Sequence, residues 1–246
     1  MGIVIAVASG KGGTGKTSVT GGVAAALAMA GQRVLCIDMD IGLRNLDISL
    51  GLSDRALMDF ADVALGRCTL SRAAVRHPDL KELSLLTAPM SLPPSLSPYR
   101  VRSMLSAART LYDYILIDAP AGLGPGFQYA VCGADRALVV ATNDASSLRD
   151  AQRTVTELSA IRDIHLVMNR IQPKLLRKLR TTIDDAMDAA GLPLIGVVPE
   201  DPQVMLCANL GQPLLVRNRR GAAQACWSIA IRSSRNSCSM ILHCFV

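Results

Sequence analysis

The sequence predicts a single-domain α/β fold in which a mostly parallel sheet carries helices on both faces. Strand-like and helix-like segments alternate along all 246 residues. The strand-like segments are continuous apolar runs rather than alternating ones, as in parallel sheets that are buried on both sides. Half of the residues are apolar, which is ample for a core, and no Pro/Gly/Ser-rich linker divides the chain.

Seven short apolar runs are predicted as strands. They are Ile3–Ala8, Arg33–Asp38, Leu83–Thr87, Tyr114–Asp118, Ala137–Ala141, His165–Met168 and Leu194–Val198. Seven further segments are predicted as helices, of which the first is rich in Ala, Val and Leu. They are Thr17–Ala30, Ala56–Ala64, Tyr99–Leu111, Ser146–Ile161, Lys174–Ala190, Pro202–Leu210 and Gly221–Ile231. The proline-punctuated stretch 89–98 predicts a loop.

A glycine-rich loop follows the first predicted strand. Its residues are Gly10, Lys11, Gly12, Gly13, Thr14, Gly15, Lys16 and Thr17, followed by Ser18. They satisfy the phosphate-loop pattern G-x-x-x-x-G-K-[ST], in which backbone N–H groups surround phosphate oxygens. A helix N-terminus placed after such a loop favours anions, because its free N–H groups and its dipole both attract phosphate. A chance glycine-rich turn fits this context poorly. We therefore expect the chain to have a P-loop NTPase fold and these residues to bind a nucleoside triphosphate.

Three predicted strands end on chemically active groups, and the carboxyl ends of parallel strands meet at one edge of a sheet. The first ends on the phosphate loop, the second on Asp38 and the fourth on Asp118. Lys16 is expected to contact the β- and γ-phosphates, and the Thr17 hydroxyl to ligate Mg²⁺. Asp118 ends an apolar strand of Walker B form and is expected to bind the metal through a water, although a strand-terminal aspartate is also a common helix cap. Gly122 supplies a flexible turn that could sense the γ-phosphate.

Lys11 is a second lysine at the start of the loop, where an ordinary phosphate loop accepts almost any residue. The pattern K-G-G-x-G-K-[ST] resembles the deviant Walker A motif of the MinD/ParA family of ATPases. The resemblance covers the chain from Ile3 to about Gly221. It implies an ATP-dependent homodimer in which Lys11 reaches the phosphates bound by the other subunit, where an ammonium can neutralise charge on the transferred phosphoryl group. The alternative is that Lys11 is a solvated loop cation.

The same resemblance implies roles for residues outside the phosphate loop. Segment 40–47, with the sequence D-I-G-L-R-N-L-D, is similar to the family's first switch, which includes Asn45. The resemblance assigns Asp40 to positioning the attacking water and Asp38 to the outer shell of Mg²⁺. The residues expected to act in catalysis are therefore Lys11, Lys16 and Asp40. Adenine is expected to contact residues that follow the last two predicted strands, namely Asn169, Arg170, Pro199, Glu200 and Asp201, although each could form an ordinary turn.

Partners are also implied by the resemblance. The division-site members of the family associate with the inner membrane, recruit a division inhibitor and are released by an activator of slow hydrolysis. The expected partners are therefore a MinC-like inhibitor, a MinE-like activator and an anionic inner-membrane surface. Arg149, Asp150 and Arg153 lie on the helix that matches the family's partner face, and they are either contacts or a solvated stripe.

Positive charge is concentrated near the C-terminal end. Residues 217–246 contain five arginines and no acidic residue, in a chain whose formal net charge is +6. This segment predicts an anionic partner surface, either lipid or nucleic acid. We expect an ATPase domain over residues 1–232 and a divergent tail over 233–246 that could contact membrane, although it has no clean amphipathic stripe. The alternative is a ParA-like partition ATPase that binds DNA nonspecifically through Arg217, Arg219 and Arg220, but we do not expect a nucleic-acid partner.

The remaining features concern the compartment. No apolar stretch reaches the ~18 residues that a spanning helix needs, and no signal peptide precedes the first predicted strand. Seven cysteines lie far apart without C-x-x-C spacing, which favours reduced thiols over disulfides or a metal-delivery protein of the same superfamily. Cys36 and Cys132 are expected in the core. We expect a cytoplasmic protein that is peripheral on the inner membrane; a filament that binds ATP without turnover is a further alternative.

Overall fold

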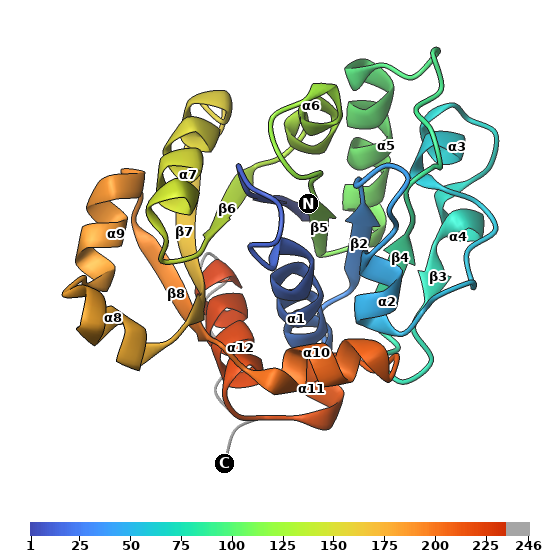
Figure 1. The fold of residues 1–246 in the computed structure, drawn as a ribbon. Helices are drawn as coiled ribbons and strands as arrows, with labels where there is room; N and C mark the ends of the chain where they lie inside the picture. The colour runs from blue at the N-terminus through green and yellow to red at the C-terminus, as the bar shows by residue number, and fades with distance from the viewer. Residues whose placement is uncertain (235–246) are drawn as a thin grey trace.

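The computed structural model describes residues 1–234, which form one eight-stranded sheet with helices on both faces (Figure 1). The strand order is β3-β4-β2-β5-β1-β6-β7-β8, and neighbouring strands are parallel except for β3 and β4. The strands are β1 (Ile3–Ala8), β2 (Val34–Asp38), β3 (Val75–Arg76), β4 (Leu83–Leu86), β5 (Tyr114–Asp118), β6 (Arg136–Ala141), β7 (Asp163–Ile171) and β8 (Leu194–Pro199). The predicted fold class is confirmed.

The helices divide between two hydrophobic cores, one on each face of the sheet. Side chains of α3, α4, α5, α6, α7 and α9 enter one core, and those of α1, α2, α10, α11 and α12 enter the other. The helices are α1 (Lys16–Met29), α2 (Leu46–Leu50), α3 (Phe60–Ala64), α4 (Leu70–Ala73), α5 (Pro98–Leu111), α6 (Pro125–Val131), α7 (Ala145–Glu157), α8 (Pro173–Leu179), α9 (Ile183–Ala190), α10 (Pro202–Asn209), α11 (Leu214–Arg217) and α12 (Ala222–Ser234). Within residues 1–234, no helix has the length and apolar character needed to cross a membrane.

Successive residues of the central strands point into opposite cores. In β1, Val4 and Ala8 belong to one core, whereas Ile5 and Val7 belong to the other. Burial on both sides explains why these strands are continuous apolar runs. It also gives rigid support to the groups at their carboxyl ends.

The single helix expected over 174–190 is wrong, because the structure has two helices there. Arg180 has a φ of 52° and ends α8. Thr182 then begins α9 through a capping box with Asp185, in which each side chain bonds the other residue's backbone N–H. A capping box satisfies N–H groups that a continuous helix would bond otherwise, so it favours a new start. The T-x-x-D spacing carries this signal in the sequence.

Other helix boundaries also differ from the predictions. The helix expected over 56–64 begins only at Phe60, because Asp59 caps it in a capping box with Asp62. The short elements α2, α4, α6, α11 and β3 were not predicted, and α2 includes Asp47, the last residue of the predicted switch segment.

The C-terminal boundary differs from the prediction, and one cysteine expected in the core lies at its edge. The last helix extends to Ser234, past the expected boundary at 232, and the rest of the predicted tail lies outside the described residues. Cys36 is buried as expected, and Cys132 is partly buried and packs against the edge of one core.

Candidate functional site

The phosphate loop connects β1 to α1 and is shaped by close contacts with two other elements. Gly15 adopts a φ of 83° at the N-terminus of α1, and a Cβ there would collide with the side-chain amide of Asn169, at the end of β7. A Cβ on Gly10 would collide with the backbone carbonyl of Asp150, on α7. Both positions therefore require glycine for packing as well as for access to phosphate. The hydroxyl of Thr14 is buried and has no hydrogen-bond partner among the described residues.

A buried polar cluster lies directly behind this loop. Lys16 Nζ is 3.6 Å from Asp118 Oδ1, and both side chains are almost completely buried. Thr17 Oγ1 donates a hydrogen bond to Asp118 Oδ2 at 2.7 Å, and Thr20 Oγ1 donates to Oδ1 at 3.2 Å. Burial raises the pKa of Asp118, and the Lys16 charge opposes this shift. The structure thus brings together Lys16, Thr17 and Asp118 as predicted.

Asp38 lies beside Asp118, because β2 pairs with β5 in the register that sets these two residues opposite each other. Its carboxylate accepts hydrogen bonds from the backbone N–H groups of Asp40 (2.9 Å) and Leu46 (3.1 Å). Burial, followed by repulsion from Asp118, raises the pKa of Asp38 to about 7. The cluster therefore has a strong preference for additional positive charge.

The residues at this cluster fit a Mg²⁺ ion. Two buried carboxylates, of Asp38 and Asp118, face one buried ammonium, and the Thr17 hydroxyl supplies a further oxygen. Mg²⁺ favours such oxygens and retains waters and phosphate oxygens as ligands. Among residues 1–234, no group of three or more His, Cys, Asp or Glu side chains is placed to bind a metal. When bound, Mg²⁺ would supply charge neutralisation at the phosphates.

Of the two predicted switch residues, Asn45 borders a cavity at the phosphate loop, whereas Gly122 is not among the residues that line it. Asp40 and Asn45 border a cavity of about 430 Å³ that also contacts Lys16 and Thr17. Asn45 precedes α2 without capping it through its side chain, so its amide can turn to a ligand. Gly122 has a φ of 78° in the loop after β5, and its added Cβ would meet no neighbour within 4 Å. A γ-phosphate in this cavity would therefore lie between segments that follow β2 and β5.

A second cavity, of about 390 Å³, lies where the adenine base was expected. All five residues predicted to contact adenine line it: Asn169, Arg170, Pro199, Glu200 and Asp201. Apolar side chains from α1, β8, α10, α11 and α12 form much of the remaining wall, which suits the flat face of a base. Asn169 Nδ2 donates to the carbonyl of Thr14 at 2.8 Å. This bond links the cavity to the phosphate loop and leaves the amide oxygen of Asn169 to accept from a ligand.

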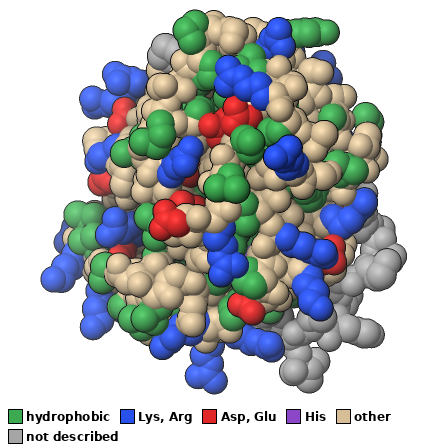
Figure 2. Space-filling view, turned by 90° about the vertical axis from the view of Figure 1, so that its right-hand side faces the viewer, with side chains coloured by type: hydrophobic (Ala, Val, Ile, Leu, Met, Phe, Trp, Pro, Cys, Tyr) green, Lys and Arg blue, Asp and Glu red, His purple; other side chains and the backbone are tan. Residues whose placement is uncertain are grey.

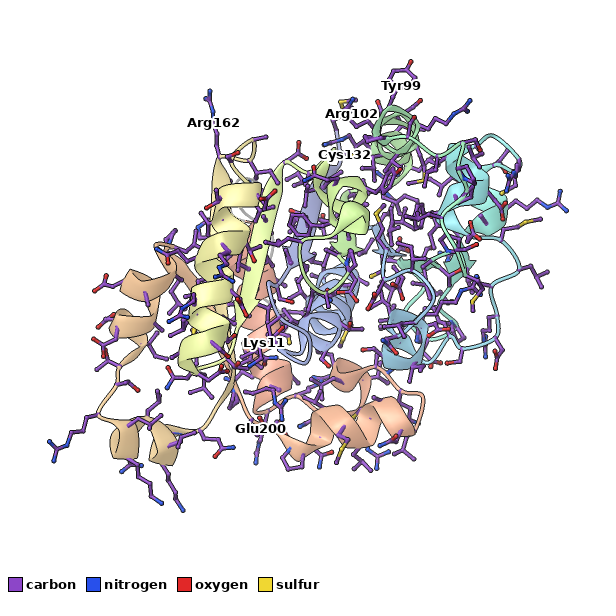
Figure 3. The ribbon with its side chains drawn as sticks, turned by 45° about the horizontal axis from the view of Figure 1, so that its top comes forward. Lys11, Tyr99, Arg102, Cys132, Arg162 and Glu200 are labelled. Carbon is purple, nitrogen blue, oxygen red and sulfur yellow. The ribbon has the colours of Figure 1, made fainter. Side chains whose placement is uncertain are left out.

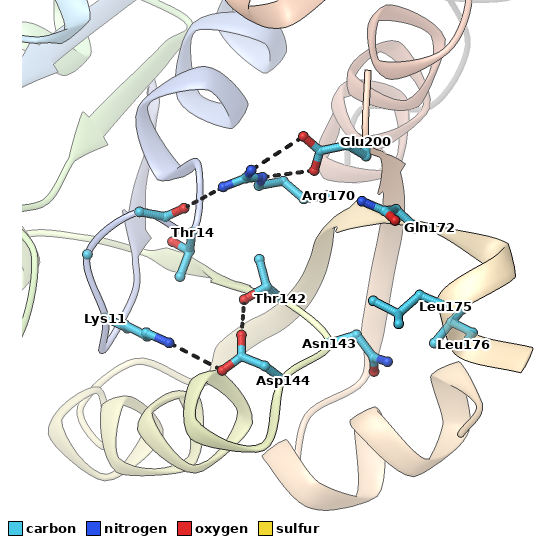
Figure 4. Close-up of a pocket in the computed structure, with 12 residues that line it drawn as sticks. Lys11, Thr14, Thr142, Asn143, Asp144, Arg170, Gln172, Leu175, Leu176 and Glu200 are labelled. Carbon is cyan, nitrogen blue, oxygen red and sulfur yellow. Dashed lines mark hydrogen bonds and ion pairs between the residues drawn. The ribbon is translucent and has the colours of Figure 1, made fainter. Parts of the chain in front are cut away.

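Arg170 and Glu200 line this cavity and form an ion pair, which Figure 4 shows in the neighbouring pocket beside Lys11 and Asp144 that the pair also lines. Arg170 Nε lies 2.9 Å from Glu200 Oε2, and its Nη1 donates to the carbonyl of Gly13 at 3.4 Å. The hydrogen bond to Glu200 and its charge raise the pKa of Arg170. Arg170 therefore connects Glu200, which follows β8, to the phosphate loop.

Asp201 has a structural role that the sequence did not reveal. Its Oδ1 accepts from the Gln203 N–H at 2.9 Å, which caps α10, and its Oδ2 accepts from the Ala222 N–H at 3.0 Å, at the start of α12. A Cβ on Gly221 would collide with this carboxylate. One side chain thus joins the N-termini of α10 and α12, which both line the second cavity.

Lys11 points to α7 in this single chain (Figures 3 and 4). Its Nζ donates to Ser146 Oγ at 2.8 Å and lies 3.3 Å from Asp144 Oδ1. Burial raises the pKa of Asp144, but hydrogen bonds from Thr142, Ser146, the Ser147 N–H and Lys11 outweigh it and keep the pKa well below its usual range. Neither Asp144 nor Ser146 was predicted as a site residue, because a strand-to-helix junction gives no sign of which distant side chain it meets.

The predicted partner residues lie on α7, next to this contact. Arg149 and Arg153 are exposed, whereas Asp150 is half-buried and lies 3.6 Å from Arg153. The backbone of Asp150 packs against Gly10, so α7 is in direct contact with the phosphate loop.

The fold and the site define a P-loop protein that binds a nucleoside triphosphate at the carboxyl ends of β1, β2 and β5. The family described as the CobQ/CobB/MinD/ParA nucleotide binding domain matches residues 5–214, and the chain belongs to this family. It is 40% identical over 226 residues to the septum site-determining protein MinD of Helicobacter pylori, covering 87% of this chain and 84% of the relative. The chain is a MinD-like ATP hydrolase.

Two solved structures agree with this assignment. MinD in the MinC:MinD cell division protein complex of Aquifex aeolicus superposes with a TM-score of 0.87 at 36% identity, covering 97% of this chain and 98% of that chain. The septum site-determining protein MinD of Pyrococcus horikoshii, complexed with Mg-ADP, gives a TM-score of 0.83 at 28% identity, covering 96% of this chain and 97% of that chain. Nucleotide and Mg²⁺ use therefore accords with both the family and the buried cluster.

Proposed function

We propose that this protein positions the division septum through an ATP-driven cycle of dimerisation on the cytoplasmic face of the inner membrane. ATP with Mg²⁺ closes two copies face to face, and Lys11 of each copy reaches the phosphates of the other. The dimer associates with anionic lipid and recruits a MinC-like inhibitor. A MinE-like activator then stimulates hydrolysis by Lys16, Asp40 and the trans lysine, and the subunits separate.

The position of Lys11 is the observation that carries this proposal. Its ammonium is exposed and contacts Asp144 and Ser146 at the start of α7, whereas the other lysine of the site, Lys16, is buried against Asp118. The two lysines therefore have different tasks: Lys16 belongs to the interior of its own site, whereas Lys11 is available to a second molecule. The MinD relative found in complex with MinC supports the inhibitor as the partner.

Nucleotide-dependent association tests the proposal. The purified protein is measured with ATP analogue, with ADP and without nucleotide, by light scattering for mass and by co-sedimentation with anionic vesicles. We expect a dimer and vesicle binding with the analogue, and a monomer that stays in the supernatant otherwise. A monomer in all three states, or equal pelleting in all three, would falsify the cycle.

The DNA-binding alternative has its own signature. A ParA-like protein would bind duplex DNA in the ATP state with an affinity that falls steeply with salt, and would ignore vesicles. The identity to septum site-determining relatives favours the division-site function over the partition function. A vesicle and DNA comparison in the same buffer separates the two functions.

A further inference from the structure

One edge of the molecule combines exposed apolar side chains with exposed cations. It is formed by α8 with its flanks (172–180) and by α10, α11 and the loop to α12 (202–220), and we call it the α8–α11 edge. Figures 1 and 3 both place these helices along the same border of the molecule. By contrast, the face that carries α3, α4 and β3 shows basic, acidic and apolar side chains interspersed (Figure 2).

The first part of the edge is α8. Its cations, Lys174, Arg177, Lys178 and Arg180, are all exposed, and none forms an ion pair with a described residue. The sequence from 164 to 183 contains no acidic residue. Leu175 and Leu179 are exposed between these cations, and α8 has no buried residue. A helix with so little packing of its own is suited to a partner surface.

The second part of the edge comprises α10, α11 and the following loop. Its exposed apolar residues are Met205, Leu206, Leu210 and Val216. Arg217, Arg219 and Arg220 are exposed beside them. No acidic residue occurs between 202 and 234, so no negative charge on these helices offsets the arginines.

The combination of exposed cations and exposed apolar side chains indicates which class of partner fits this edge. Nucleic-acid phosphates would use the cations, but would gain nothing from burying Leu179, Leu206 and Leu210. An anionic lipid surface uses both, because headgroups attract Lys and Arg while apolar side chains enter the boundary with the acyl chains. Exposed apolar residues rimmed by polar ones mark such contact sites.

We propose that the α8–α11 edge lies against anionic lipid when the protein is on the membrane. The proposal rests on the membrane cycle described above and deepens it by naming a surface of the folded domain, separate from residues 235–246. Each cation of the edge strengthens attraction to the anionic leaflet, by about fivefold in partitioning. The apolar residues add contact that salt does not screen.

Paired variants of the full chain test this surface. Lys178→Glu with Arg219→Glu removes charge from both parts of the edge, and Leu179→Ser with Leu206→Ser removes apolar contact. The matched controls are Arg162→Glu and Tyr99→Ser, since both residues are exposed and Figure 3 shows them far from Lys11 and Glu200. Each protein, bound to ATP analogue, is co-sedimented with phosphatidylcholine vesicles with and without phosphatidylglycerol. Melting temperature and hydrolysis without vesicles confirm that each variant is folded.

The expected result is a loss of more than about tenfold in binding to anionic vesicles for the charge pair, a smaller loss for the serine pair, and none for the controls. Basal hydrolysis remains at the wild-type rate. Edge variants that bind vesicles as the wild type does overturn this inference and leave the membrane cycle intact. A wild-type protein that ignores vesicles overturns both. Loss of binding to duplex DNA, with vesicle binding unchanged, also overturns the inference and assigns the edge to nucleic acid.

Discussion

The ammonium of Lys11 lies 3.3 Å from the carboxylate of Asp144 in the same chain, and 2.8 Å from the hydroxyl of Ser146. The side chains of Lys11 and Asp144 are 45% and 48% exposed. An ion pair so open to water contributes only about 0–1 kcal/mol. The contact therefore orients Lys11 but holds it only weakly. A phosphate bound by a second subunit can compete with Asp144 for the ammonium.

Lys11→Ala should abolish dimerisation while leaving the stability of the fold nearly unchanged. Because the ion pair is weak, the melting temperature should stay within about 2 °C of the wild type. Dimerisation with ATP analogue should disappear, and stimulated hydrolysis should fall by about 10³-fold, since a cation supplied in trans stabilises the transition state. Light scattering and phosphate release measure these effects. Lys81→Ala, at another exposed lysine, is the control, and a variant that still dimerises would refute the trans role.

Gly15→Ala should disrupt the loop by a collision as well as by backbone strain. The new Cβ would strike the Asn169 amide and break its bond to Thr14. We expect nucleotide affinity to fall by more than about tenfold, since the loop and the base cavity lose their link. Gly31→Ala is a matched control, because Gly31 has a φ of 80° and no neighbour within 4 Å of an added Cβ. Calorimetric titration should show normal nucleotide affinity for Gly31→Ala. Equal losses of affinity in Gly15→Ala and Gly31→Ala would contradict the role of the collision with Asn169.

Asp118→Asn should remove the benefit of Mg²⁺. The amide can still accept from Thr17 but lacks the charge that attracts a divalent cation. Affinity for ADP should then be nearly the same with Mg²⁺ and with EDTA, whereas the wild type should bind more than about tenfold tighter with Mg²⁺. Asp113→Asn changes a partly buried carboxylate that directly precedes the other end of β5 and pairs with Arg33, and this variant should behave like the wild type. A Mg²⁺ effect that survives in Asp118→Asn would exclude this carboxylate from the metal site.

Asp201→Ala should weaken both stability and base binding. It removes acceptors at the starts of α10 and α12, and each lost cap costs about 1 kcal/mol. Urea unfolding measures the free energy of unfolding, and calorimetric titration measures the affinity for ATP, which reports on the shape of the cavity. Asp201→Asn should recover part of the lost stability and part of the lost affinity. Thr182→Ala removes the cap of α9, away from the site, so it should cost stability alone. If Asp201→Ala leaves affinity unchanged, the two caps do not shape the cavity.

Acid should destabilise the protein through His77. This buried ring accepts N–H bonds from Asp79 and Leu80 at Nδ1, so the proton resides on Nε2, which faces the carbonyl of Leu50. Burial lowers the pKa of His77 below its ordinary value of 6.5. The folded state therefore favours the neutral ring, and the stability it contributes is complete above pH 6.5 and is lost as the pH falls toward the folded-state pKa.

The measurement is the free energy of unfolding of the wild type and of His77→Gln between pH 7.5 and 5. The difference between the two proteins should shrink as the pH falls, with a slope of at most about 1.4 kcal/mol per pH unit for one proton. Comparing the two proteins cancels the titration of carboxylates elsewhere. A difference that stays constant would contradict a neutral, buried His77.

Local patterns predicted the strands well and the helix boundaries less well. Runs such as 114–118 are apolar on both faces, which identified them as buried strands, and most of them appear within a residue of the predicted bounds. The strand predicted over 165–168 is the exception, because β7 extends from Asp163 to Ile171. The predicted helix boundaries were wrong where a side chain caps the first turn of a helix, as Thr182 and Asp59 do through their capping boxes. The four-residue helices α4 and α11 have no periodicity to detect.

Local sequence patterns were enough to predict the fold class, the phosphate loop and the convergence of Asp38 and Asp118, because residue spacing and strand ends follow local rules. The folded chain was needed to find that Lys11 contacts Asp144, that Asn169 bonds to Thr14, and that the carboxylate of Asp201 caps two helices. These contacts join residues far apart in the chain, up to 155 positions for Asn169 and Thr14. Such pairs depend on how whole helices and strands pack, and packing is a property of the complete fold rather than of any local pattern.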